Sequence, residues 1–272
     1  METYPGDETA IFTRVNPAGT LTLELWTGIY EDRPLRTEEQ GHYYRTLIGF
    51  CTDLWHGKAL LRDPLTPAQI ESIKEFETLV ICGGRLEPKV AHSENYRGKP
   101  PFAVVVPENP RFRGLAGLEV IARHRGFHRP LLIDWGQSSI KLRVHSQELT
   151  EIINREYELF PLIKDCELRP ETAHSRLRHY YHKLISRFKS DIDSVFLALP
   201  VEINHKGVAQ PSSYQGMGGN LSTLFSLSAQ TPVYVLNDAE AAAVGSHEYL
   251  HGKSLVLTVG SGLGGCLCHE IF

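Results

Sequence analysis

Short apolar runs that end at a glycine, a proline or an acidic residue recur along this chain, and amphipathic stretches separate them. Short apolar runs bounded by turn residues indicate buried strands, whereas apolar residues at helical spacing indicate helices. Strands that alternate with helices throughout a chain are typical of α/β proteins. The length of 272 residues suits one large domain or two of ordinary size, at about 100–200 residues per domain.

This pattern predicts the individual elements. We expect strands at 79–82, 102–106, 131–134, 140–144, 149–160, 195–200, 232–236, 255–259 and 266–272. We expect helices at 38–55, 67–76, 114–124, 169–189, 220–229 and 239–245. Near the N-terminus, Asn16-Pro17-Ala18-Gly19 has the turn residues of a β-hairpin between strands at Ala10–Arg14 and Thr20–Trp26.

The composition excludes several classes of protein. Hydrophobic residues make up 42% of the chain and charged residues 22%, which are proportions of a globular protein with a sizeable core. A net charge of −4 argues against a nucleic-acid-binding protein, because such a protein needs a basic excess. A phosphate site stays possible, since it requires only backbone N–H groups and one or two cations.

The cysteines and the N-terminus predict a cytoplasmic protein. Five cysteines without a framework spacing are expected to be reduced thiols. The N-terminal residues lack the basic and apolar regions of a signal peptide. No apolar run approaches the length of about 18 residues that a membrane span requires. We therefore expect neither a membrane nor a nucleic acid as a partner.

Three strand ends have residues suited to ligand binding or catalysis. The first has the sequence DWGQSSIK at 134–141. We expect a tight turn in which Gly136, Gln137 and Ser138 approach phosphate oxygens, because glycine leaves the backbone N–H groups unobstructed. Asp134 at the strand end is placed to bind Mg²⁺ through water. Lys141 can add a cation to the same site. The alternative is an ordinary β-hairpin, because short glycine motifs have many false positives.

The second motif is GSGLGG at 260–265, which also lies between two expected strands. Four glycines in a short turn favour close backbone approach to an anion, and we assign Gly260, Ser261, Gly262 and Gly264 to phosphate binding. It is neither a Walker A motif nor a dinucleotide-binding fingerprint, because a strand follows where those motifs need a helix. The alternative is a flexible hairpin loop.

The third motif is Asn237-Asp238, which follows an apolar strand and opens a small-residue helix. An aspartate held at this position can accept a proton from a substrate hydroxyl. The alternative is a structural role, because Asp is a favoured N-cap residue.

Taken in this order, the three motifs resemble those of the ROK (repressor, open reading frame, kinase) sugar kinases. LLIDWGQSSIKLRV, LVLTVGSGLGG and VYVLNDAEAAAVG look like the two phosphate motifs and the catalytic-aspartate motif of that family. The resemblance implies the two-domain actin-like ATPase fold, which is ribonuclease H-like, with ATP and Mg²⁺ in the cleft between the domains. It also implies Asp238 as the catalytic base, and it allows a homodimer.

The order of the motifs implies a circular permutation. LVICGGRL at 79–86 looks like the late adenosine motif of the family, with Gly83 and Gly84 beside the nucleotide, and GLAGLEVI at 114–121 looks like its closing helix. Both precede the first phosphate motif in this chain. We therefore expect one lobe at 130–245 and a second lobe made of 1–124 and 247–272. Such rearrangements are tolerated where the joined ends lie close together.

The acceptor pocket departs from the family pattern. The Glu-x-Gly-His segment that contacts the sugar in that family is not found here, and neither is its cysteine-rich zinc loop. Asn237, Asn220 and Glu202 are the remaining candidates for contact with an acceptor. The expected function is transfer of the ATP γ-phosphate to a hydroxyl of a sugar or sugar-like molecule. The alternative is a non-catalytic sensor of sugar or nucleotide derived from such a kinase.

One substitution tests the second phosphate motif. A β-branched residue at Gly262 would place side-chain atoms where phosphate oxygens are expected and would strain a turn that favours glycine. We expect the Gly262→Val variant to bind ATP at least about tenfold more weakly, or ~1.4 kcal/mol. Calorimetry of the folded variant measures this, and an unchanged affinity would remove the loop from the site.

Overall fold

The structure is a computed structural model in which the chain divides into two compact units. Unit 1 contains Gly114–Gly245, and unit 2 contains Gly6–Arg113 and Ser246–Phe272. The helix at 114–124, which we expected in the second lobe, groups with unit 1. The structure describes residues 15–21, 37–58, 67–84, 99–136, 139–144, 150–154, 170–188, 192–204, 208–209, 219–225, 231–260 and 263–268.

Unit 1 contains a mixed five-stranded sheet with the order β10-β7-β4-β5-β6. β4, β5 and β6 form an antiparallel meander, whereas β7 pairs in parallel with both β4 and β10. A small second sheet pairs β8 with β9. The strands are β4 (Pro130–Trp135), β5 (Ser139–Val144), β6 (Thr150–Asn154), β7 (Ser194–Leu199), β8 (Val208–Ala209), β9 (Gly219–Asn220) and β10 (Val233–Asn237).

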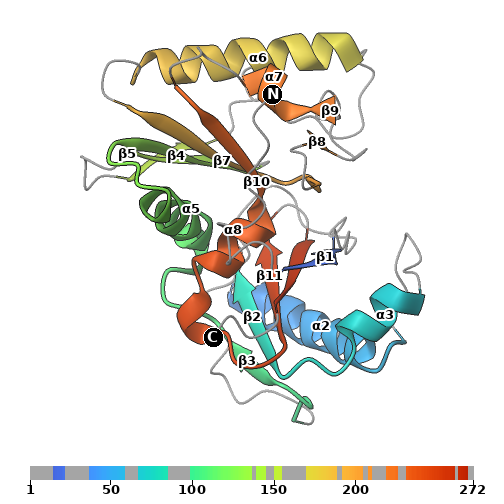
Figure 1. The fold of residues 1–272 in the computed structure, drawn as a ribbon. Coiled ribbons are helices and arrows are strands. Elements are labelled where there is room, and N and C mark those ends of the chain that lie inside the picture. The colour runs from blue at the N-terminus through green and yellow to red at the C-terminus, as the bar shows by residue number, and fades with distance from the viewer. Residues whose placement is uncertain are drawn as a thin grey trace. The chain divides into compact units, whose positions relative to one another are not determined.

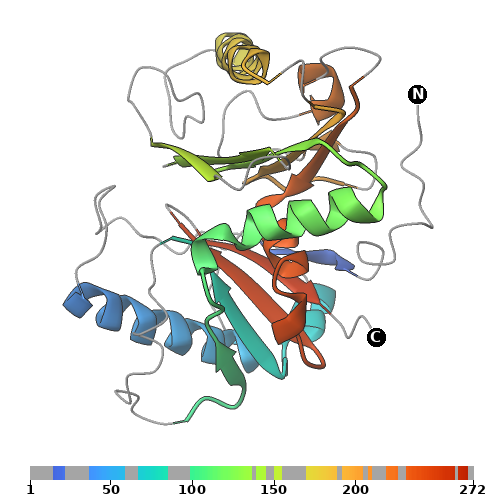
Figure 2. The same ribbon diagram turned by 90° about the vertical axis from the view of Figure 1, so that its left-hand side faces the viewer.

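Helices cover both faces of the unit 1 sheet (Figures 1 and 2). On one face lie α6 (Pro170–Ser186) and α7 (Leu221–Phe225). Their residues Tyr181 and Phe225 belong to one buried cluster with every second residue of β4, including Trp135. On the other face lies α5 (Arg113–His124), and Phe127, just after it, packs against Phe196 of β7. Strands buried on both faces read as continuous apolar runs, which explains PLLIDW and SVFLAL.

Unit 2 contains a second mixed sheet, with the order β1-β12-β11-β2-β3. β11, β12 and β1 pair antiparallel, and β2 pairs in parallel with both β11 and β3. The elements are β1 (Val15–Leu21), α2 (Thr37–Trp55), α3 (Pro67–Ile73), β2 (Thr78–Cys82), β3 (Ala103–Val105), η1 (Pro110–Phe112), η2 (His247–Tyr249), β11 (Ser254–Val259) and β12 (Leu263–Cys268).

The core of unit 2 lies between this sheet and the helices α2 and α3, which Figure 1 shows next to each other. Apolar residues recur at helical spacing along α2, and Leu47 and Cys51 face the same cluster as Ile73 of α3. Leu79 and Leu257 contribute from the strands. The helix predicted over residues 38–55 is confirmed, and its buried apolar residues form one face.

The two sheets share one pairing scheme when unit 2 is followed from β11 through β12 to β1, β2 and β3. In that order, the first three strands form an antiparallel meander, the fourth pairs in parallel with the first, and the fifth pairs in parallel with the fourth. β4, β5, β6, β7 and β10 of unit 1 pair in the same way. In unit 2 the first two strands of this scheme follow the last three in the sequence.

Most expected elements are present, and the mixed α/β class is confirmed. The hairpin expected around Asn16-Pro17-Ala18-Gly19 is wrong, because these residues lie within the single strand β1. Val15 pairs with Cys268 and Thr20 with Cys266, so the register shift between them accommodates the extra residues. β1 is an edge strand, where a proline such as Pro17 does not remove a ladder hydrogen bond from the sheet interior.

Helix α8 (Asp238–Val244) packs closely on α5 within unit 1, and a glycine permits this approach. A Cβ atom at Gly117 of α5 would overlap the carbonyl oxygen of Ala241 and would lie 2.9 Å from the backbone nitrogen of Gly245. Because both opposing atoms belong to the backbone, neither can rotate away. The two helices can therefore keep their separation only with glycine at 117.

This contact generates a stability prediction. We expect Gly117→Ala to lower the free energy of unfolding by about 1–3 kcal/mol, as overpacking does in a close-packed interior. Gly49→Ala on α2 is the matched control, because no atom of the described residues lies within 4 Å of its Cβ position and alanine favours a helix. Urea unfolding of both variants measures the difference. A Gly117→Ala variant as stable as the control would contradict the packing argument.

Candidate functional site

Two carboxylates lie at the same edge of the unit 1 sheet. Asp134 pairs with Ala198 on one side of β7, and Asn237, which precedes Asp238, pairs with Leu199 on the other side. Because β4, β7 and β10 are parallel, their carboxyl ends share one edge, which is where open α/β sheets bind ligands. The structure therefore brings together the first and third motifs, which are about a hundred residues apart.

Asp134 forms an ion pair with Lys141, which lies directly opposite it on β5. The Lys141 Nζ atom donates to Asp134 Oδ2 at 2.6 Å. The side chains are only 10% and 13% exposed, for Asp134 and Lys141 respectively, so this pair is screened less than a surface ion pair. The register of the β4–β5 hairpin fixes both groups on one face.

Asp238 is partly buried at the first position of α8. Burial, and after it the nearby Asp134 carboxylate, raise the pKa of Asp238 to about 7, whereas Lys141 acts in the opposite direction. A carboxyl group with a pKa near the working pH can both accept and return a proton. This property is uncommon for an aspartate, and perturbed pKa values gather at functional sites.

Asn237 is the N-cap of α8, so Asp238 does not have the capping role that the sequence left open. The Asn237 Oδ1 atom accepts hydrogen bonds from the backbone N–H groups of Ala239 and Glu240, and Glu240 completes a capping box. The Asn237 Nδ2 atom donates to the Val201 carbonyl at 2.8 Å. These contacts give Asn237 a structural function, and its contact with an acceptor stays a prediction.

The other acceptor candidates belong to the segment that follows β7. The bond from Asn237 to Val201 ties the start of this segment, where Glu202 follows, to the start of α8. Desolvation of the carboxyl group raises the pKa of Glu202. Asn220 lies in β9, where its backbone pairs with Val208, and its side chain lies outside the described residues.

Both phosphate motifs form hairpins, as the sequence predicted. Gly136 lies directly after β4, and its backbone nitrogen donates to the Ser139 carbonyl across a tight turn. Gln137 and Ser138 lie outside the described residues. Gly260 follows β11, and a Cβ atom there would meet no atom of the described residues within 4 Å.

In the second hairpin, Val259 pairs with Leu263 on either side of the turn. Gly264 pairs with Thr258 within the ladder. Ser261 and Gly262 lie outside the described residues. The strands that hold the turn are therefore in place, and the contacts of the turn itself stay a prediction.

Within unit 2, Gly83, which the sequence predicts to lie beside the adenosine together with Gly84, lies against the second hairpin. Gly83 has φ +105°, and a Cβ atom on it would overlap the Val259 backbone. Only glycine fits both the conformation and the space. The Gly83 nitrogen also donates to the Pro110 carbonyl, and the Arg111 side chain lies 3.5 Å from the Cβ position of Gly84. The sequence signalled the glycines but gave no sign that Arg111 lies beside them.

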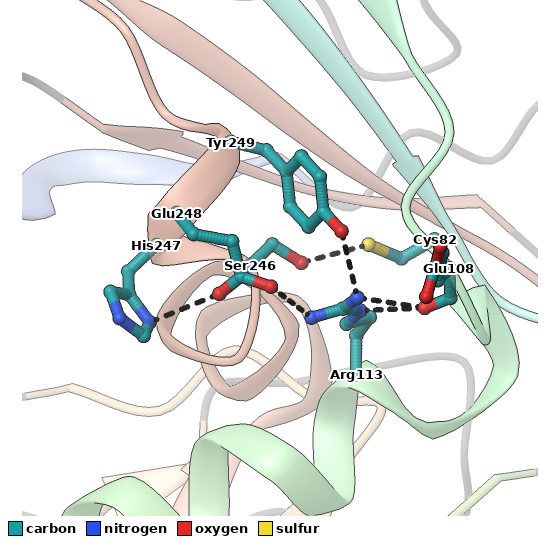
Figure 3. Close-up of polar contacts among 7 residues, drawn as sticks. All are labelled: Cys82, Glu108, Arg113, Ser246, His247, Glu248 and Tyr249. Atoms are coloured by element: carbon teal, nitrogen blue, oxygen red, sulfur yellow. Dashed lines mark hydrogen bonds and ion pairs between the residues drawn. The ribbon is translucent and has the colours of Figure 1, made fainter.

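No pattern in the sequence predicted the polar cluster around Arg113 in unit 2 (Figure 3). The Arg113 guanidinium pairs with Glu248 at 2.7 Å, donates to the Glu108 carbonyl and lies 5.0 Å from the centre of the Tyr249 ring. Cys82 Sγ lies 3.4 Å from Ser246 Oγ, and burial raises the pKa of Cys82 to about 11. Its thiol is thus protonated and unreactive at neutral pH.

Cys51, Cys82, Cys266 and Cys268 are buried, and none of these four described cysteines forms a disulfide bond. None of the described helices is both long and apolar enough to cross a membrane. Neither a scan against protein-family models nor a search of curated proteins found a match to this chain.

The raised pKa of Asp238 predicts how stability depends on pH. Between its ordinary pKa of 3.8 and its native value of about 7, the folded state holds a proton that the unfolded state releases. Stability therefore falls as the pH rises through this window. Asp238→Asn removes the titrating group, so we expect the variant to gain at least about 1 kcal/mol over the parent at pH 8, and less at pH 5.

Asp193→Asn is the control, because we expect it to change the free energy of unfolding in the opposite direction. Burial acts against ionisation of Asp193, but hydrogen bonds from the backbone nitrogens of Arg129 and His128 outweigh it and lower the pKa. This substitution should therefore destabilise the protein at neutral pH. Urea unfolding at both pH values measures both variants, and a stability loss in Asp238→Asn at pH 8 would contradict the assignment.

Proposed function

We propose that this chain is an ATP-dependent phosphotransferase that transfers the γ-phosphate to a hydroxyl group of a sugar or sugar-like small molecule. The observation that carries the proposal is the partly buried Asp238, with a pKa near 7, beside the Asp134–Lys141 pair. The shared pairing scheme of the two sheets supports a permuted, actin-like arrangement, and the two glycine hairpins support phosphate binding.

In this proposal, the Asp238 carboxylate accepts the proton of the acceptor hydroxyl as the oxygen attacks the γ-phosphorus, and the bond from that phosphorus to the β,γ-bridging oxygen breaks, so that ADP leaves. General bases of this kind contribute typically 10²–10⁴-fold to a rate. Asp238 lies at the end of β10 and at the start of α8, and the Asn237 cap fixes that corner of the backbone. The remaining acceleration comes from positioning and charge neutralisation, as in phosphoryl transfer generally.

The described residues fit a magnesium ion that keeps most of its water. Asp134 offers hard carboxylate oxygens, which Mg²⁺ prefers, and Mg²⁺ needs only one or two protein carboxylates. In the described part of the chain, no group of three or more His, Cys, Asp or Glu side chains could enclose a metal. The bound ion would neutralise charge on the phosphates during transfer.

The nucleotide is assigned to the glycine turns. In unit 1, Gly136 with Gln137 and Ser138 would donate backbone N–H groups to phosphate oxygens, and Lys141 would add a positive charge. In unit 2, Gly83 and Gly84 would lie beside the adenosine. Gly260, Ser261, Gly262 and Gly264 would contact phosphate oxygens. The acceptor is assigned to the segment that contains Glu202 and Asn220.

Phosphoryl transfer by Asp238→Asn tests the proposal. Purified parent, Asp238→Asn and the Asp193→Asn control are incubated with labelled Mg-ATP and a panel of sugars, aminosugars, cyclitols and nucleosides. We expect the parent to phosphorylate a member of the panel and Asp238→Asn to do so about 10²–10⁴-fold more slowly, with ATP binding retained. The parent rate should rise with pH through about 7, because only the ionised carboxylate accepts a proton.

Two results would contradict the proposal. Turnover of Asp238→Asn within a few-fold of the parent would end its assignment as the base. A parent protein that binds Mg-ATP and an acceptor yet transfers no phosphate would be the sensor that the sequence left as an alternative.

A further inference from the structure

The first turn of α5 lies directly against the Asp134 carboxylate. A Cβ atom placed at Gly114 would be 2.9 Å from Asp134 Oδ2 and 3.1 Å from its Cγ. Real Cβ atoms essentially never approach another heavy atom below 3.0 Å. The φ angle of Gly114 is not in the left-handed region, so this position needs glycine for space and not for backbone conformation.

Helix α5 is held in this position by contacts further along its length. Gly117 lies against the Ala241 backbone of α8, and Glu119 accepts a hydrogen bond from Arg143 of β5 at 2.9 Å. Leu115 and Leu118 are fully buried. The helix therefore cannot move away from the sheet without breaking these contacts.

Asp134 is held from the other side by Lys141, whose Nζ donates to the same Oδ2 atom at 2.6 Å. The carboxylate thus lies between the lysine ammonium group and the N-terminal turn of a helix of 12 residues. The positive end of a helix dipole favours a negative charge at this place. Displacement of Oδ2 by an added methyl group would disturb the ion pair as well.

We propose that Gly114 is a positioning residue for Asp134. By carrying no side chain, it lets the first turn of α5 fix the carboxylate against Lys141, in the orientation that serves the metal–nucleotide complex. This inference rests on the proposed function, in which Asp134 binds Mg²⁺ through water. If Gly114 were needed only for helix packing, its substitution would have the same effect whether or not Asp134 is present. The dependence of that effect on Asp134 therefore distinguishes the two roles.

The test compares Gly114→Ala with Gly49→Ala, which makes the same chemical change on α2, at a position where no described residue lies within 4 Å of the Cβ atom. Alanine favours a helix over glycine, so the control should be at least as stable as the parent. We expect Gly114→Ala to bind Mn²⁺–ATP, measured by electron paramagnetic resonance, at least about tenfold more weakly. The control should bind it as the parent does.

The carboxyl ¹³C resonance of Asp134 gives a readout that does not depend on the proposed function. It should shift in Gly114→Ala and stay in place in Gly49→Ala. An unshifted Asp134 resonance in Gly114→Ala would overturn the inference while leaving the proposed function intact. An unchanged Mn²⁺–ATP affinity in a Gly114→Ala variant that folds as the parent does would have the same consequence. A parent that binds no metal–nucleotide would overturn the proposed function, and the inference with it.

The double variant Gly114→Ala/Asp134→Ala decides the case if Gly114→Ala fails to fold. Removal of the Asp134 carboxylate leaves the added methyl group with room, so the double variant should melt at or above the temperature of Asp134→Ala alone. If the double variant also fails to fold while Asp134→Ala folds, the methyl group collides elsewhere. Gly114 would then be a packing residue, which overturns the inference.

Discussion

Strand β7 pairs in parallel with β4 on one side and β10 on the other, and the candidate site of unit 1 depends on this arrangement. Parallel pairing puts the carboxyl ends of all three strands at one edge, so Asp134 and Asp238 become neighbours. The antiparallel β5 then supplies Lys141 directly opposite Asp134. A shift of one residue in either register would turn one of these side chains to the opposite face of the sheet.

The neighbouring carboxylates lower the stability of the fold, and the same interactions raise the pKa of Asp238. Burial and the charge of Asp134 both act against ionisation of Asp238, so the folded protein is less stable at neutral pH than it would be with a neutral side chain. Lys141 offsets part of the repulsion. Proteins tolerate unfavourable burial and charge repulsion of this kind at functional sites and compensate for the lost stability elsewhere. Here the buried apolar residues of β4 and β7 contribute that stability.

Glycines at three places allow backbone and side chains to approach closely. Gly83 lies against Val259, Gly114 against the Asp134 carboxylate and Gly117 against Ala241. Each contact joins segments that are distant in the sequence, and each would be lost with a larger residue. In unit 2, the Gly83 contact brings the ends of β2 and β11 together, so that two glycine motifs far apart along the chain lie side by side.

The sequence by itself determined the elements, because apolar periodicity and turn residues act locally. It located the strand before Asp134, the hairpin at Gly136 and the start of α8 at Asp238 to within a residue or two. It misread Asn16-Pro17-Ala18-Gly19 as a turn, because only the partner strand β12 decides that these residues form a bulge in an edge strand. Tertiary structure alone decided that Asn237 is the helix cap, that Arg111 lies beside Gly84 and that Gly114 abuts Asp134. It also decided the pKa of Asp238. These properties arise from burial and from contacts between distant segments, which no local pattern of residues encodes.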